Sequence, residues 1–207
     1  MKKLLLIFCF GLTMTGCASL HNTGYLDNYD QLKSVSRFGQ ADWKPDTKQK
    51  AYVDPGYAYD SSQTLRINRP EIAADVQLDA VEKKMYADYL YNHLTDSLGK
   101  ESIYRLTQDS AATLELDSYI GVLDPGNGFV RWFFGLGFGK ADFQTESKIK
   151  DTATGNTVVS YAYRTQDSGS PLFGLNLSEM DNQKQVDNAM KEIAKSYSKF
   201  LEKKFKK

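Results

Sequence analysis

The chain has 207 residues, of which 41% are hydrophobic, 13% aromatic and 25% charged, and this is the composition of an ordinary folded domain. Its 26 lysines and arginines equal its 26 aspartates and glutamates, so no overall positive field attracts nucleic acid, and we predict no nucleic-acid partner. Two cysteines and two histidines are too few for a zinc centre built from these residues, and they argue against haem or an iron–sulfur cluster. We therefore expect no cofactor and no metal.

Residues 1–16 have the pattern of a secretory signal peptide. A short cationic start precedes an apolar run over residues 4–12, about half of the roughly 20 residues that a membrane-spanning helix needs. Residues 14–17 read Met-Thr-Gly-Cys and resemble a bacterial lipobox. The resemblance implies cleavage before Cys17 and attachment of several acyl chains to it, palmitate among them, which give a stable membrane anchor. The alternative is an ordinary signal peptide cut nearby, which leaves Cys17 a free thiol.

The residue after the cysteine bears on the destination of the protein. In bacterial lipoproteins of this kind, a residue other than aspartate at this position usually accompanies export to the outer membrane, and Ala18 fits that pattern. The resemblance therefore implies a lipid-anchored protein on the periplasmic side of the cell outer membrane. Cys9 is removed with the signal peptide and Cys17 is blocked by acylation, so we expect no disulfide in the mature chain.

The remaining chain divides into a tether and one domain. Residues 17–49 comprise the lipidated cysteine and a polar tether rich in turn-forming residues, and residues 50–207 form a single domain. The tether carries too many large apolar groups for a pure linker, so we expect part of it to lie along the folded body. These groups are Tyr25, Leu26, Tyr29, Leu32, Phe38 and Trp43.

Two short strands and a long helix are predicted at the start of the domain. The strands lie at residues 51–53 and 63–67. The helix is predicted from Pro70 to Leu98, with Gly99 as its carboxy-terminal cap. Its apolar stripe, at helical spacing, consists of Leu78, Val81, Met85, Leu90, Leu94 and Leu98.

Period-two alternation then predicts three longer strands. Residues 111–123 alternate, with Leu114, Leu116, Ile120 and Val122 on one face and Thr113, Glu115, Asp117 and Tyr119 on the other. Residues 141–151 show the same alternation, and residues 157–165 are predicted to form the second strand of a hairpin with them. The turn between these two strands contains Gly155, which is free to adopt a positive φ.

A last helix is predicted to begin near Ser178 or Asp181. Its apolar stripe consists of Val186, Met190, Ile193, Tyr197, Phe200 or Leu201, and Phe205. Lysines cluster at its carboxy end, where they complement the negative end of the helix dipole. The elements together predict a two-layer α+β domain, with a mainly antiparallel or mixed sheet, both amphipathic helices on one face and the other face in contact with water.

Residues 129–140 form the most unusual segment, because aromatic residues and glycines alternate there around one arginine and one lysine. Phe134 and Ala141 stand where a phosphate-binding loop needs a glycine and a serine or threonine, which argues against nucleotide binding. Two interpretations remain open. Either the aromatics fill the end of the core, or they form an exposed interaction patch for a partner or a membrane. That patch would comprise Arg131, Trp132, Phe133 and Phe138.

The sequence offers no recognisable catalytic set, and we do not predict an enzyme. His93 lies near the inner stripe of the long helix and is either a partly buried structural residue or a general base without an identified nucleophile. Glu115 and Asp117 lie on the polar face of one strand, where solvation is the default, whereas a glycosidase needs carboxylates opposed across a cleft.

Four short motifs in order along the mature chain resemble a group of uncharacterised lipoproteins of Gram-negative bacteria, classed as a domain of unknown function. The motifs are residues 24–33, Tyr-Val-Asp-Pro at 52–55, Gly-Leu-Gly-Phe-Gly-Lys-Ala at 135–141 and Asp-Thr-Ala-Thr-Gly at 151–155. The resemblance implies a small envelope domain with a mixed sheet and two helices. It transfers no catalytic residue.

Three functions therefore compete. The leading hypothesis is a non-catalytic interaction or envelope-accessory module with an envelope protein partner, anchored to the outer membrane through Cys17. The second is a periplasmic enzyme or small-ligand carrier with a pocket between helix and sheet. The third is a structural homo-oligomer, since the sequence leaves the oligomeric state open.

Overall fold

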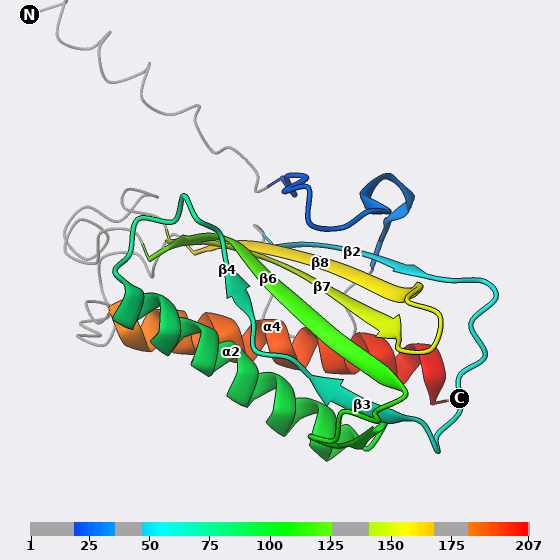
Figure 1. The fold of residues 1–207 in the computed structure, drawn as a ribbon. Coiled ribbons are helices and arrows are strands. Elements are labelled where there is room, and N and C mark those ends of the chain that lie inside the picture. Colours follow the sequence, from blue (N-terminus) through cyan, green and yellow to red (C-terminus); the bar gives the residue numbers. More distant parts are fainter. Residues whose placement is uncertain (1–18, 36–46, 126–140, 168–181, 207) are drawn as a thin grey trace, which may run out of the picture.

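A computed structural model describes residues 19–35, 47–125, 141–167 and 182–206. They form an eight-stranded sheet with two helices packed side by side on one face (Figure 1). This confirms the predicted two-layer α+β architecture. The short 3-10 helix η1 (Tyr29–Gln31) lies on the opposite side of the sheet, in the amino-terminal segment.

The sheet is mixed. Its central strands are the antiparallel set that the sequence predicts, and three shorter strands run parallel to their neighbours. The order across the sheet is β1 (Lys33–Ser34), β2 (Thr47–Val53), β8 (Thr157–Asp167), β7 (Ala141–Asp151), β6 (Leu114–Asp124), β3 (Thr64–Ile67) and β5 (Arg105–Leu106), with β4 (Glu71–Ile72) also paired to β6.

The β7–β8 hairpin is confirmed. Oδ1 of Asp151 accepts hydrogen bonds from the backbone N–H groups of Ala153 (3.0 Å) and Thr154 (2.8 Å), which closes the turn. Gly155 follows with φ +74°, a left-handed conformation that glycine adopts without strain.

Helix α4 (Asn182–Phe205) buries the predicted stripe, including both Phe200 and Leu201, while Phe205 is half-buried. Two tyrosines of β8 reach it from the sheet. The hydroxyl of Tyr161 lies 2.9 Å from Oγ of Ser196, and the hydroxyl of Tyr163 donates to Oε1 of Glu192 (2.8 Å). The helix therefore packs on the sheet through the face that its sequence periodicity predicts.

Helix α2 (Ala80–Glu101) begins later than predicted, and the expectation of a helix from Pro70 was wrong. The residues after Pro70 form β4 and pair with β6, because a sheet neighbour satisfies their backbone better than the first turn of a helix. The true amino-terminal cap is Asp79, whose carboxylate accepts from the N–H groups of Val81 and Glu82 in a capping box.

Two details of the α2 stripe also differ from expectation. Val81 is 76% exposed, because at 100° per residue it lies on the opposite side of the helix from the buried residues. The buried residues are Tyr86, Ala87, Leu90, Leu94 and Leu98. Gly99 lies inside the helix, and Ser102 caps it with φ 49°.

Strand β6 carries a bulge that the alternation does not reveal. Its pairing with β7 shifts register between Ile120 and Val122, so Leu123 rather than Val122 occupies the core face. Gly121 is at the bulge. A Cβ added there would lie 2.6 Å from Cγ2 of Thr23, so the amino-terminal segment approaches the sheet too closely for a larger residue.

The second face of the sheet is covered in part, which corrects the prediction that water contacts all of it: Gln144, Glu146 and Arg164 are buried there, whereas Glu115 and Lys150 stay partly exposed. Residues 19–32, which we call the strap, cross this face above the sheet (Figure 1). Leu26 and Leu32 of the strap are buried with Ala162 in a small apolar cluster of their own. The division between tether and domain at residue 50 stays a prediction, although β2 runs continuously through it.

Candidate functional site

The strap begins at a fixed contact. Nη1 of Arg164 donates a hydrogen bond to the carbonyl oxygen of Ser19 (2.8 Å). The same guanidinium is buried and binds Asp142 through two bonds, Nε to Oδ1 (3.0 Å) and Nη2 to Oδ2 (2.6 Å). A two-pronged pair of this kind fixes the orientation of the arginine. The backbone is therefore attached to the sheet two residues after Cys17, which itself lies outside the described residues.

A fully buried carboxylate holds the next part of the strap. Oε2 of Glu146 accepts from the hydroxyl of Thr23 (2.8 Å), and Oε1 accepts from Nε2 of Gln144 (3.1 Å). Gln144 in turn exchanges hydrogen bonds with the backbone of His21, donating to its carbonyl (2.6 Å) and accepting from its N–H (3.0 Å). Burial raises the pKa of Glu146 despite these hydrogen bonds, which work in the opposite direction.

Aromatic contacts fix the strap further along. The ring of Tyr25 stacks on Tyr119 of β6, with centroids 4.9 Å apart and planes 10° from parallel. The ammonium of Lys148 lies 4.3 Å from the Tyr25 ring centroid and donates to the Tyr25 carbonyl (3.1 Å). Burial raises the pKa of the Tyr25 hydroxyl, so this phenol is neutral throughout the physiological range.

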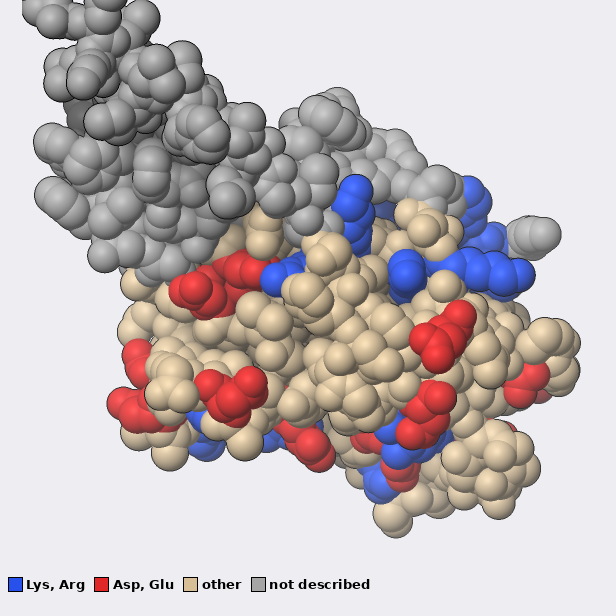
Figure 2. Space-filling model, turned by 90° about the horizontal axis from the view of Figure 1, so that it is seen from above, with Lys and Arg blue, Asp and Glu red and all other residues tan. Residues whose placement is uncertain are grey.

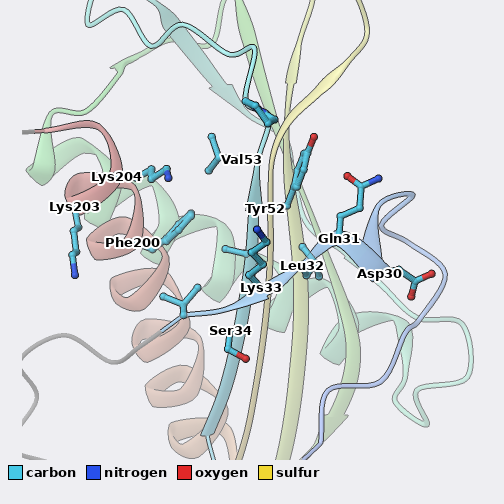
Figure 3. A pocket seen from close by; sticks show the side chains of 13 residues that line it. Asp30, Gln31, Leu32, Lys33, Ser34, Tyr52, Val53, Phe200, Lys203 and Lys204 are labelled. Carbon is cyan, nitrogen blue, oxygen red and sulfur yellow. The ribbon is translucent and has the colours of Figure 1, made fainter.

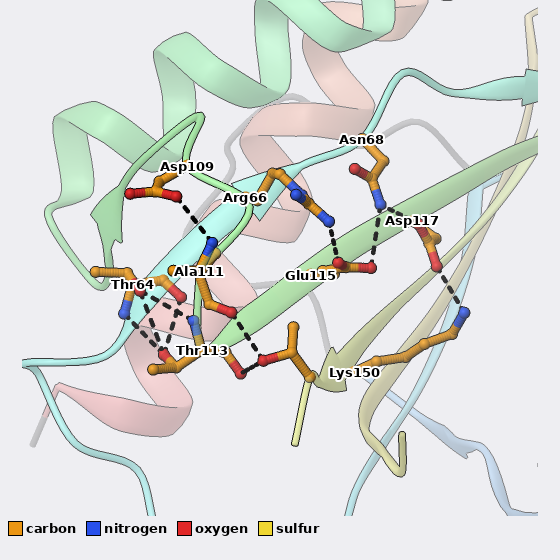
Figure 4. A network of polar contacts seen from close by, with 11 residues as sticks. Thr64, Arg66, Asn68, Asp109, Ala111, Thr113, Glu115, Asp117 and Lys150 are labelled. Carbon is orange, nitrogen blue, oxygen red and sulfur yellow. Dashed lines mark hydrogen bonds and ion pairs between the residues drawn. The ribbon is translucent and has the colours of Figure 1, made fainter. Parts of the chain in front are cut away.

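Beside the strap, a row of alternating charges joins β3, β6 and β7 (Figure 4). Arg66 pairs with Glu115, and Asp117 accepts from Nδ2 of Asn68 (2.7 Å) and pairs with Nζ of Lys150 (2.8 Å). Burial opposes ionisation of Asp117, but these two partners outweigh it and lower the pKa of the carboxyl. The two carboxylates belong to one row on one strand and are not opposed across a cleft.

His93 joins the two helices. Its Nε2 lies 2.7 Å from Oδ1 of Asp187 on α4, and both side chains are partly exposed. No hydroxyl within the described part of the chain lies at hydrogen-bond distance from the ring, so the structure supplies no nucleophile for a general base here. The contact is that of a polar bridge between α2 and α4.

A groove lies at the opposite edge of the sheet from β5, between β1, β2 and the carboxy end of α4 (Figure 3). It has a volume of about 1050 Å³. Figure 3 shows Val53 facing Phe200 and Lys204 across the space between strand and helix. Lys33 and Lys203 also line it. In the view from above, several basic side chains gather at the upper right of the molecule, and others lie along the lower edge among acidic ones (Figure 2).

The predicted interaction patch lies outside the described residues, as Arg131, Trp132, Phe133 and Phe138 all fall within 126–140. Its two flanks are described. Asp124 ends β6 and Ala141 begins β7, and Asp124 pairs with Asp142, the partner of Arg164. The connection that contains the patch therefore begins and ends beside the contact that fixes Ser19.

Sequence reasoning missed the residues that bind the strap, namely Asp142, Gln144, Glu146 and Arg164. The available signal was the set of large apolar side chains in the segment assigned to the tether, which need a dry surface. Leu26 and Leu32 find it on the face of the sheet that the alternation pattern assigns to water.

Two further observations concern metals and membrane spans. The described residues contain no cluster of three or more His, Cys, Asp or Glu side chains with the geometry to hold a metal ion. Nor does any helix in the same residues combine the length and apolar character needed to cross a membrane.

Comparisons with known proteins add a likeness of fold. No protein-family model matches the chain, and no curated protein matches it. Among solved structures, it is similar to the PelC dodecamer from Paraburkholderia phytofirmans, with 10% identity, coverage of 73% of this chain and 97% of that one, and a TM-score of 0.47.

Two further solved structures are similar. For a DUF4136 family protein from Bacteroides thetaiotaomicron the values are 9% identity, 74% and 96% coverage, and a TM-score of 0.44. A putative lipoprotein from Caulobacter crescentus has 15% identity, coverage of 67% of this chain and 91% of that one, and a TM-score of 0.36. Similarity at this level does not transfer a function.

Proposed function

We propose that this protein is a lipid-anchored envelope protein whose α+β body is a non-catalytic interaction module held close to the membrane. In this proposal Cys17 is acylated and the body faces the periplasm from the outer membrane. The observation that carries it is the bond between Arg164 and the carbonyl of Ser19, which fixes the chain immediately after the cysteine of the lipobox.

The reach of the anchor follows from the geometry of the backbone. An extended chain spans at most about 3.5 Å per residue, so Cys17 lies within roughly 7 Å of Ser19. A freely jointed tether of some thirty residues would let the body move tens of ångströms from the bilayer. With the strap bound along the sheet, the acyl chains instead hold the end of the sheet that bears Arg164 next to the lipid surface.

The aromatic segment gains a role in this arrangement. Asp124 and Ala141, which flank residues 126–140, lie beside Asp142 and therefore, in this proposal, at the membrane-proximal end of the sheet. The patch of Arg131, Trp132, Phe133 and Phe138 belongs to the segment between them in the sequence. We propose that it contacts an envelope protein partner held at the same surface, because aromatic residues and arginine are enriched at such interfaces.

The anchor is tested by intact-mass analysis of the protein isolated from membranes of its own host. The expected mass is that of a chain beginning at Cys17 with acyl groups attached, and osmotic shock should leave the protein with the membranes. The Cys17→Ala variant is the control. An unmodified thiol at residue 17, with release by osmotic shock, would contradict the proposal.

The partner contact is tested by crosslinking and pull-down from membranes. We expect the Trp132→Ala/Phe133→Ala variant to lose a partner that the wild type captures, while Val81→Ala, an exposed apolar change on α2, keeps it. An identical set of captured proteins for both variants would exclude the patch as the interaction surface.

A second candidate function is a small-ligand carrier. The observation in its favour is the groove between α4 and the β1–β2 edge, which is a pocket between helix and sheet of the kind that this function requires. Ligand that co-purifies with the protein and is detected by native mass spectrometry would support it.

A further inference from the structure

We propose that the groove between β1, β2 and α4 binds an anionic amphiphile, a single aliphatic chain that ends in a phosphate or a carboxylate. This inference rests on the carrier function proposed above and specifies its ligand. It does not depend on acylation of Cys17, and it concerns residues that the structure describes.

The floor of the groove is apolar because of strand alternation at the edge of the sheet. Ala51 and Val53 point toward α4, and Val35 joins them because its N–H bonds to the carbonyl of Gln49, which continues the β1–β2 ladder. Phe200 supplies the opposite wall. Among the described residues Ala51 is buried, whereas Val35 and Val53, nearer the rim, are only partly buried and leave apolar surface in the groove.

The size of the groove suits a small ligand. Its volume of about 1050 Å³ is close to the upper limit of the roughly 300–1,000 Å³ that is usual for ligand pockets, and slightly exceeds it. Such pockets have mostly apolar linings with a few polar groups that fix the orientation of the ligand. The groove combines both kinds of lining: apolar side chains from β1, β2 and α4, and polar side chains that come from the same elements (Figure 3).

Three of the polar groups are lysines. Lys33, Lys203 and Lys204 line the groove, and neither Lys33 nor Lys204 forms an ion pair with a described residue. The carboxy end of α4 contributes a negative charge of only about half a unit, so the ammonium groups of Lys33 and Lys204 by themselves leave a positive excess. Asp30, the one acidic residue among the described lining, lies on the far side of β2 from α4 in Figure 3.

An added peptide strand is the other ligand that an open sheet edge can take, and the ladder disfavours it. β1 already pairs with Lys50 and Ala51, and Val35 occupies the carbonyl of Gln49. A peptide could add only to the outer side of β1, which is two residues long and therefore offers few backbone partners. An aliphatic chain needs no backbone partner, and it fills the apolar floor while its head group meets the lysines.

The test uses photocrosslinking in cells that make the full chain. Pro55, an exposed residue on the rim, is replaced by a photoreactive amino acid (Pro55→p-benzoylphenylalanine), and Val81→p-benzoylphenylalanine on exposed α2 is the control. We expect a light-dependent adduct at position 55 whose mass identifies an amphiphile, and whose head group distinguishes phosphate from carboxylate. Anionic species should be enriched in it over the zwitterionic phospholipid of the same membrane.

Charge variants make the result specific. The triple variant Lys33→Glu/Lys203→Glu/Lys204→Glu should yield less adduct. We expect a reduction of at least fivefold for each lysine, because this is the effect of one basic residue on binding of an anionic head group. The matched control Lys191→Glu/Lys195→Glu changes exposed lysines elsewhere on α4 and should keep the adduct.

Four outcomes would overturn the inference: no adduct at position 55, an equal adduct at position 81, lipids in the proportions of the bulk membrane, or a protein in place of an amphiphile. The mass of the amino terminus from the same sample tests the anchor separately. An adduct on an unacylated chain would therefore sustain this inference while refuting the anchor.

Discussion

The contact between Gly121 of β6 and Thr23 of the strap gives a test of the fold with a built-in control. Gly121→Ala places a methyl group 2.6 Å from Cγ2 of Thr23, well inside van der Waals contact. Overpacking of this kind costs about 1–3 kcal/mol. The backbone itself accepts alanine, since Gly121 is not among the described glycines with positive φ, and glycine within a strand is otherwise unfavourable by roughly 0.5–1 kcal/mol. We therefore expect a net loss of about 1–2 kcal/mol in the free energy of unfolding.

The control is Thr23→Ser, which removes Cγ2 but keeps the hydroxyl that binds Glu146. In that background Gly121→Ala should be neutral or stabilising, which gives a favourable coupling of about 1–3 kcal/mol between the two positions. The measurement is urea unfolding of the four purified full chains in a non-ionic detergent. Equal effects of Gly121→Ala in both backgrounds would show that Thr23 does not lie on β6, and the account of the strap would then be wrong.

Three further predictions concern single side chains. Burial raises the pKa of Glu146 above its ordinary value of 4.5, so the contribution of this group to stability is greatest below pH 4.5 and is lost as the pH rises through the folded-state pKa. The free energy of unfolding of the wild type, relative to that of Glu146→Gln, should therefore increase as the pH is lowered from 7. A difference that stays constant with pH would contradict this. Arg164→Met leaves the half-buried Asp142 with Gln166 as a remaining donor, and it should cost about 1–3 kcal/mol in urea unfolding and increase proteolysis of the strap. Unchanged cleavage kinetics of the strap would argue against its fixed start. Val81→Lys should change the free energy of unfolding by less than about 0.5 kcal/mol, because the side chain is exposed. A loss near 2 kcal/mol would show that Val81 belongs to the buried stripe, as the sequence pattern predicts.

Local periodicity was sufficient for much of the fold. The α4 stripe from Val186 to Leu201 and the β7–β8 hairpin around Gly155 are each decided by neighbours within a few residues, and both were predicted correctly. The start of α2 was harder, because Pro70 and Asp79 both carry signals for a helix start. Pairing of Glu71 and Ile72 with β6 decides between them, and that contact is distant in sequence.

The strap could not have been predicted by the same means. His21 and Thr23 bind Gln144 and Glu146, which are 123 residues away in each case. Alternation along β7 identifies Glu146 as facing away from the helices, but it does not distinguish a surface open to water from one covered by another segment. The groove was also invisible, since it lies between strands β1 and β2 and helix α4, which is distant from them in sequence.

The central claim, that the lipid anchor is joined directly to a strap bound on the sheet, is tested most directly by hydrogen–deuterium exchange of the membrane-bound full chain, read by mass on its amino-terminal peptide. We predict a peptide that begins at an acylated Cys17 and in which the amides of His21 and Thr23, bonded to Gln144 and Glu146, exchange slowly. A peptide with an unmodified Cys17, or one in which these amides exchange completely at the shortest labelling time, would contradict the account.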